Sequence, residues 1–255
     1  GRSARKALRA APLSKEMRPI KPGMESKTYQ PLNKQGMIKI HNAALDALEQ
    51  IGFGEVPETG KEILTNAGAI MGDDGRIRFP RALVEDMIAK AAKEITLFGR
   101  NPDNDMQIGG ERVYYGTAGA AVHLVDVEKN EYRECYVQDL FDAAKIVNAL
   151  DNVHFLQRPM VCRDIPDNYE MDLNTIYACT RGTTKHVEAS FTEPGFVKGA
   201  FDLLDQIAGG EKQWRERPFV SNSNCFVVPP MKFAMESCQV MEECVRGGMP
   251  ILLLS

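Results

Sequence analysis

Four short β-rich stretches decide the fold: VHFLQRPMV at residues 153–161, KHVEASF at 185–191, PFVSNSNCF at 218–226 and PILLLS at 250–255. They begin roughly 32 residues apart, about the length of one strand followed by one helix. Each of the first three is followed by proline, then by a segment with helical periodicity, then by glycine, at Gly182, Gly209–Gly210 and Gly247–Gly248. Proline suits the first turn of a helix and glycine suits its end. This order predicts consecutive βαβ units with parallel strands and right-handed crossovers.

The predicted fold class is therefore α/β, with about four parallel strands of a partial (β/α)8 TIM barrel, which needs about eight such units when complete. An open doubly wound sheet is the alternative. Because the chain begins with Gly1 and stops inside an expected strand, we interpret it as a fragment. The expected parts are a basic N-terminal arm at 1–30, a helical and β-hairpin segment at 31–150, and the first half of the barrel at 151–255.

The segment before the barrel is predicted to contain three helices and then antiparallel β structure from Ile95 to Tyr136. The helices are expected between residues 33 and 92, and the strands at 113–115, 121–127 and 131–136, with a tight turn at Lys129 and Asn130. A helix at 139–150 then leads into the first barrel strand. The glycine-rich stretch at 116–120 lacks the spacing of a dinucleotide-binding loop, so we interpret it as a close backbone approach to a ligand or to packed side chains.

Composition excludes several classes of protein. The net charge of −4 argues against a dedicated nucleic-acid binder. The sequence contains no run of 18 apolar residues, so no membrane span is expected. The six cysteines are scattered without a C-x-x-C pair, a pattern typical of reduced cysteines in a cytoplasmic protein. The four histidines are not spaced as a zinc site. We therefore expect a cytoplasmic protein with no metal of its own.

The expected barrel strands contain polar residues, although a parallel strand covered on both faces is usually apolar throughout. A buried carboxylate such as Glu188 is tolerated only beside partners, water or a ligand. Active sites of barrels lie at the carboxyl ends of the strands. The polar residues expected toward those ends predict a binding pocket there, with an internal hydrogen-bond network as the alternative. They are Arg158, Glu188, Ser190, Asn222 and Asn224.

Several motifs, taken in order, resemble one enzyme family. LRAAP at 8–12, IH at 40–41 with AL at 44–45, LFGRNP at 97–102, VYYGT at 113–117, TTK at 183–185 and RPF at 217–219 are similar to the trimethylamine methyltransferase (MttB) family, in its larger branch without pyrrolysine. The resemblance runs from about Arg2 to Ser255. No single motif decides it, but their order and spacing together are specific.

The resemblance implies a TIM-barrel enzyme that moves a methyl group from a methylamine or a quaternary amine, such as a betaine, to the Co(I) of a corrinoid. The corrinoid is carried by a separate cognate protein, and we expect the enzyme to be a homo-oligomer. An aromatic pocket would hold the cationic donor. Its candidates are Tyr115, Phe191 and Phe226, while Arg158 or the two asparagines would meet a substrate carboxylate. No catalytic residue is assigned.

Two other functions stay open. A zinc-dependent barrel methyltransferase would require a Cys/His/Glu ligand set further along the chain. A relative without catalytic activity would bind a corrinoid protein, or sense one, without turnover.

Overall fold

The computed structural model describes residue 3, residues 24–25 and residues 30–254 of the 255-residue chain. Most of the expected basic arm at 1–30 lies outside the described residues, as does Ser255, the last residue of the fourth expected strand. Within the described part, no helix combines the length and the apolar character needed to cross a membrane.

The four expected strands form one parallel sheet in chain order. Their bounds are β9 Phe155–Gln157, β10 His186–Ala189, β11 Val220–Cys225 and β14 Ile251–Leu254. The order across the sheet is β14-β11-β10-β9, and each neighbouring pair is parallel. The predicted order and direction are confirmed. Strand β9 is shorter than the stretch at 153–161, which contains Pro159, a residue without a backbone N–H for a ladder hydrogen bond.

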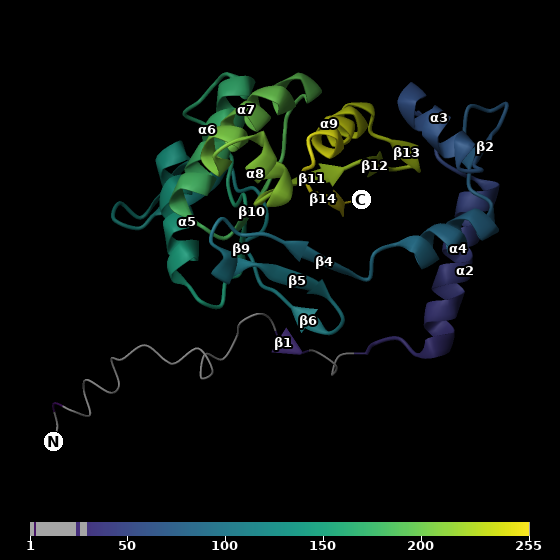
Figure 1. The fold of residues 1–255 in the computed structure, drawn as a ribbon, viewed down its shortest axis with the longest axis horizontal. Helices are drawn as coiled ribbons and strands as arrows, with labels where there is room; N and C mark the ends of the chain where they lie inside the picture. Colours follow the sequence, from purple (N-terminus) through teal and green to yellow (C-terminus); the bar gives the residue numbers. More distant parts are fainter. Residues whose placement is uncertain (1–2, 4–23, 26–29, 255) are drawn as a thin grey trace.

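Four helices pack against one face of this sheet (Figure 1). They are α5 Val137–Ala149, α6 Asn168–Gly182, α7 Val197–Ala208 and α9 Met235–Arg246, with the short α8 Glu211–Glu216 beyond α7. One hydrophobic core joins strand residues Leu156 and Val187 to helix residues such as Leu140, Ile176 and Leu204. A doubly wound sheet has helices on both faces. Helices on one face agree better with a barrel wall, whose closure stays a prediction.

A β-hairpin covers the other face of the sheet. Strands β4 Glu94–Leu97 and β5 Met106–Gly109 pair antiparallel. Between the hairpin and the sheet lies an open, mostly apolar cleft of about 750 Å³, lined by hairpin residues such as Leu97 and Met106 and by sheet residues such as Phe155 and Glu188. The sequence predicted antiparallel structure in this region but not this pair of strands.

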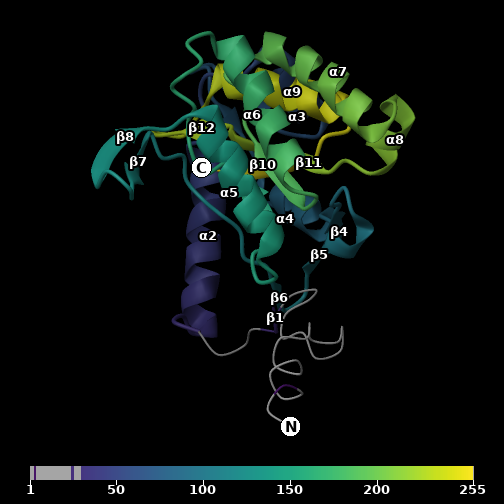
Figure 2. The ribbon, with the colours of Figure 1, turned by 90° about the vertical axis from the view of Figure 1, so that its left-hand side faces the viewer.

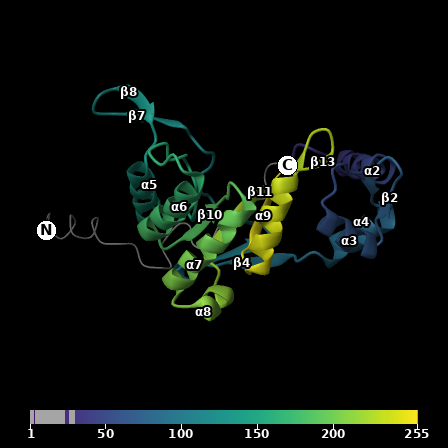
Figure 3. The same cartoon turned by 90° about the horizontal axis from the view of Figure 1, so that it is seen from above.

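The three expected N-terminal helices are present as α2 Lys34–Gln50, α3 Glu58–Asn66 and α4 Arg81–Lys90, with a small hairpin of β2 Ile70–Met71 and β3 Ile77–Arg78. They gather at one end of the molecule (Figure 3). There they meet a second hairpin, β12 Val227–Val228 with β13 Lys232–Phe233, which the sequence did not predict. Gly54 joins the two through backbone hydrogen bonds to Met231 and Phe233.

The remaining strands are shorter than predicted. Strand β6 Arg112–Val113 pairs with β1 Met24–Glu25, and β7 His123–Asp126 pairs with β8 Glu131–Glu134. The β7–β8 hairpin projects from the body of the molecule (Figure 2). At its turn Asn130 adopts a positive φ of 54°, as the predicted tight turn between these strands requires.

Two glycines after helical segments serve different purposes. Gly209 ends α7 with a φ of 92°, the left-handed conformation expected of a glycine at a helix end. Gly182 does not: it is the last residue of α6, and an added Cβ would lie 2.5 Å from the Cβ of Ala144 in α5. The expectation that Gly182 ends its helix by adopting a positive φ is therefore wrong. The glycine is required because α5 packs closely on α6 at this position.

Candidate functional site

A row of polar side chains crosses the sheet on the face opposite the helices. The register pairs Glu188 with Gln157 on one side and with Ser221 on the other. Gln157 Nε2 donates to Glu188 Oε1 at 2.9 Å, and Ser223 forms a further side-chain hydrogen bond with Glu188. The Glu188 side chain is buried, 6% exposed. Burial raises the pKa of this carboxyl, and the bonds from Ser223 and Gln157 oppose that effect.

The buried histidine at the start of β10 holds the covering hairpin in place. His186 Nδ1 lies 2.8 Å from the carbonyl oxygen of Phe98, which only accepts, so Nδ1 must carry the hydrogen. Nε2 then accepts from the Ser221 hydroxyl at 2.9 Å. Burial lowers the pKa of His186 to about 4. The neutral ring therefore joins the loop after β4 to strand β11.

This histidine predicts a pH dependence of stability. Its pKa is lowered from 6.5 to about 4 on folding, so the unfolded chain binds the proton more readily between these values. Its contribution is fully present above pH 6.5 and is lost as the pH falls toward 4, by about 3 kcal/mol. Urea unfolding of His186→Gln should therefore show a flatter pH profile than the unmodified protein. His123→Gln, an exposed site on β7, should keep the original slope. Equal slopes for the original chain and His186→Gln would contradict this.

Three of the predicted site residues line one small cavity at the carboxyl ends of β10 and β11. Phe191, Asn222 and Asn224 surround it, and its volume is about 80 Å³. The two asparagines are 0% and 4% exposed. Asn222 is in register with Ala189, a residue of the core beneath the helices, so both asparagines lie on the opposite face from Glu188. The structure therefore does not bring Glu188 and the two asparagines together in one pocket.

The other predicted residues lie apart from one another. Tyr115 is half exposed and stacks on His154 at the start of β9. Arg158 follows β9. Burial raises the pKa of the Asp172 carboxyl in α6, and the positive charge of Arg158 opposes that rise. Ser190 is half-buried just after β10. Phe226 lines an apolar pocket between β12–β13 and the N-terminal helices. Tyr115, Phe191 and Phe226 therefore do not form one aromatic cage.

Three of the motifs that carry the family resemblance, at 97–102, 183–185 and 217–219, meet at the amino ends of the strands. Arg217 Nη2 donates to Asp105 at 2.7 Å and its guanidinium lies 4.7 Å from the ring centre of Phe98. Arg100 donates to the carbonyl oxygens of Thr180 and Thr183. These bonds hold the hairpin and the loop that follows it onto the sheet and α6.

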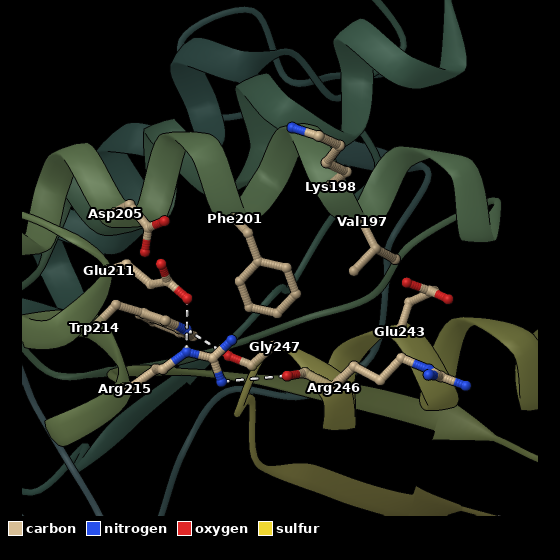
Figure 4. Close-up of a pocket in the computed structure, with 10 residues that line it drawn as sticks. All are labelled: Val197, Lys198, Phe201, Asp205, Glu211, Trp214, Arg215, Glu243, Arg246 and Gly247. Atoms are coloured by element: carbon tan, nitrogen blue, oxygen red, sulfur yellow. Dashed lines mark hydrogen bonds and ion pairs between the residues drawn. The ribbon is translucent and has the colours of Figure 1, made fainter.

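A charged groove between α7, α8 and α9 is the other surface candidate (Figure 4). Arg215 donates to Glu211 and to the carbonyl oxygen of Arg246, and Trp214 donates to that of Gly247. Since Trp214 also packs on Phe219, just before β11, the groove lies beside the strand starts. These bonds join helix to helix, so we assign the groove a structural role.

Burial raises the pKa of the five buried thiols and makes them poor nucleophiles. Five of the six cysteines are buried, and Cys225 is exposed. Burial raises the pKa of Cys162 to about 11 and those of Cys179 and Cys244 to about 12, so they stay protonated at neutral pH. No group of three or more His, Cys, Asp or Glu side chains able to hold a metal ion occurs among the described residues.

Comparison with known proteins agrees with the resemblance seen in the motifs. The family model for trimethylamine methyltransferase (MTTB) matches residues 1–255. A trimethylamine methyltransferase of Desulfitobacterium hafniense (strain DSM 10664 / DCB-2) is 30% identical over 217 residues, 85% of this chain and 43% of that protein. A glycine betaine methyltransferase of Desulfitobacterium hafniense (strain Y51) is 24% identical over 229 residues, 89% of this chain and 47% of its own length. The chain thus spans about half the length of the curated relatives it matches.

Proposed function

The chain belongs to the trimethylamine methyltransferase family, and from this premise we propose a methyltransferase that moves a methyl group from a methylamine or quaternary amine to a corrinoid carried by a partner protein. Relatives named for trimethylamine and for glycine betaine support a trimethylamine-like or betaine-like donor. The structural observation that carries the proposal is Glu188, a carboxylate buried on the face of the sheet without helices.

A buried carboxylate is a suitable counter-charge for a methylated ammonium ion. Charges attract more strongly in the protein interior than in water, and a quaternary amine offers no N–H for ordinary hydrogen bonds. Gln157 and Ser223 hold the Glu188 carboxylate by hydrogen bonds, so it need not reorganise when a cation arrives. In this proposal Glu188 binds and orients the donor.

The corrinoid of this proposal is carried by a partner protein, as the family membership implies. A reduced corrinoid would supply the cobalt nucleophile that accepts the methyl group. The four histidines lie in α2, in β7 and around the starts of β9 and β10, and none lies at the carboxyl ends of the strands, where a barrel binds its substrates. The surface around the carboxyl ends is the site proposed for the encounter with the partner protein.

The architecture belongs to the same proposal. Four parallel strands in chain order, with α5, α6, α7 and α9 on one face, correspond to the first half of a (β/α)8 barrel. The three-part division at residues 30 and 150 and the homo-oligomeric, cytoplasmic state are further expectations that accompany it.

The proposal predicts a loss of activity when the carboxylate is neutralised. In the complete gene product, assayed with its corrinoid protein in the reduced state and a panel of methylamines and betaines, Glu188→Gln should lower kcat/KM by about 100-fold, since it removes a preorganised charge. The glutamine can still hydrogen-bond with Gln157 and Ser223, so its unfolding in urea should be little changed. Methyl transfer is read from the absorption change of the corrinoid.

Glu128→Gln, which removes an equally negative but exposed side chain near the β7–β8 turn, is the matched control and should leave kcat/KM unchanged. The absence of corrinoid methylation with every N-methyl donor would overturn the methyltransferase proposal itself. Methylation with unchanged kcat/KM in Glu188→Gln would remove only the role of Glu188.

A further inference from the structure

The N-terminal half of α2 is exposed on all sides within the described part of the chain. Between residues 34 and 44 only Gly36 is half-buried, and every other residue is exposed. Met37 and Ile40 are 52% and 57% exposed. This end of the helix stands clear of α4 in two views (Figures 1 and 2). Because packing of an apolar face supplies most of the stability of a helix in water, the exposed apolar side chains indicate a surface that packs on another molecule or segment.

The exposed apolar residues lie on one face of α2. Met37, Ile40 and Ala44, which we call the α2 ridge, are followed by Leu48, and the spacing of three or four residues keeps all of them on one side of the helix. Leu48 also lines the apolar pocket between β12–β13 and the N-terminal helices. The α2 ridge and the pocket are therefore two parts of one continuous surface.

The apolar pocket is open and suited to the apolar face of a helix. Its volume is about 500 Å³, and every residue that lines it is apolar. At its rim, Ile63 of α3 and Met87 of α4 are 64% and 44% exposed. Exposed apolar surfaces of this kind mark interaction sites, and a groove between helices receives an amphipathic helix that presents residues at a spacing of three and four. The α2 ridge has this spacing.

The charges beside the α2 ridge and beside the pocket are of opposite sign. The exposed half of α2, residues 34–44, contains Lys34 and Lys39 and no aspartate or glutamate. Helix α3, at the rim of the pocket, contains Glu58 and Glu62 against one lysine, Lys61. Opposite charges at the edge of an interface speed the encounter and help to select the partner. The charge pattern therefore favours the α2 of a second copy as the occupant of the pocket.

We propose that two copies of this chain pack about a twofold axis, with the α2 ridge of each copy in the apolar pocket of the other. A twofold interface needs a surface that is complementary to itself, and a ridge and a pocket on one continuous surface meet this requirement. Because α2 is one continuous helix and its Leu48 is part of the pocket wall, the ridge cannot fold back into the pocket of its own copy.

Sedimentation equilibrium of the complete gene product, without a corrinoid protein, tests this interface. The unmodified protein should form a dimer, or a larger assembly with an even number of copies. Ile40→Glu should raise the dissociation constant at least about 100-fold, because a twofold dimer contains the site twice and each site would bury an unpaired carboxylate among apolar side chains. Ile63→Lys, at the pocket rim, should also weaken the dimer. Ile146→Glu, at a position 61% exposed on α5, is the matched control and should not change the dissociation constant.

A mixture of the two variants gives a sharper result. In a mixed dimer the unmodified ridge of Ile63→Lys meets the unmodified pocket of Ile40→Glu, so one of the two sites is intact, and the other site brings opposite charges together. The mixture should therefore form dimers at concentrations at which either variant alone is monomeric. Both positions are more than half exposed in the single chain, so circular dichroism should show that each variant is folded.

A complete protein that is monomeric at every concentration would overturn the proposal and assign the pocket to another segment of its own chain. A dimer that is insensitive to both variants would place the interface elsewhere, and a mixture that stays monomeric would exclude the reciprocal arrangement. None of these outcomes depends on corrinoid methylation, so the interface and the proposed function are tested separately.

Discussion

Replacing Lys185 with methionine is expected to lower the free energy of unfolding by about 3–5 kcal/mol, because a buried cation leaves its partners unpaired when it is removed. The Lys185 side chain is 4% exposed, and its ammonium donates to the carbonyl oxygens of Val147, Leu150 and Val153, each at 2.6 Å. These carbonyls lie at and beyond the end of α5, where helical backbone acceptors lack partners and a positive charge is favourable.

Urea unfolding followed by circular dichroism measures this loss. Methionine keeps the length and the apolar stem of the side chain, so the change isolates the ammonium. Lys198→Met is the matched control, since Lys198 is exposed on α7 and pairs with Asp202 one turn away. It should cost no more than about 0.5 kcal/mol. Similar losses for the two variants would show that the three carbonyls do not depend on Lys185.

A second large loss, also about 3–5 kcal/mol, is expected for Trp214→Ala. Trp214 is 1% exposed, lies edge-on to Phe201 and Phe219 with ring centres 5.9 and 5.3 Å away, and donates from Nε1 to the carbonyl oxygen of Gly247 at 3.0 Å. Alanine would leave a cavity where α7, α8 and the start of β11 meet. The loss is measured by urea unfolding followed by circular dichroism.

Tyr132→Ala removes an aromatic ring that is 81% exposed on β8 and should change stability by no more than about 0.5 kcal/mol. Trp214→Phe keeps an aromatic ring but removes the indole donor. Its loss of stability should lie between those of Trp214→Ala and Tyr132→Ala. A Trp214→Ala variant as stable as Tyr132→Ala would contradict the packing described for α8.

The order and direction of the sheet were predictable because the pattern repeats. Each of the four stretches is short and β-rich, and each gap is long enough for one crossover helix, so parallel neighbours in chain order were the simplest arrangement. The β12–β13 hairpin and α8 were not predictable in the same way. They interrupt a crossover, and Val227–Val228 and Glu211–Glu216 are too short to show a period.

The candidate site was predictable in part. The sequence indicated that Glu188, Asn222 and Asn224 were unusual, because polar residues are rare in covered parallel strands. It did not show that Glu188 and the asparagines lie on opposite faces, since that depends on the register of β10 against β11. Lys185 was missed because lysines are usually exposed, and nothing local shows that three carbonyls from α5 and the residues after it meet its ammonium.

The sequence by itself determined the elements that local spacing controls: parallel strands in chain order, the helices between them, the three N-terminal helices and the family. Only the tertiary structure decided which side chains meet. Alternation along a strand assigns residues to two faces, but which face belongs to the helices, and which residues of neighbouring strands stand side by side, depends on packing between segments more than 30 residues apart. That packing placed Glu188 beside Gln157, and Asn222 and Asn224 around a separate polar cavity.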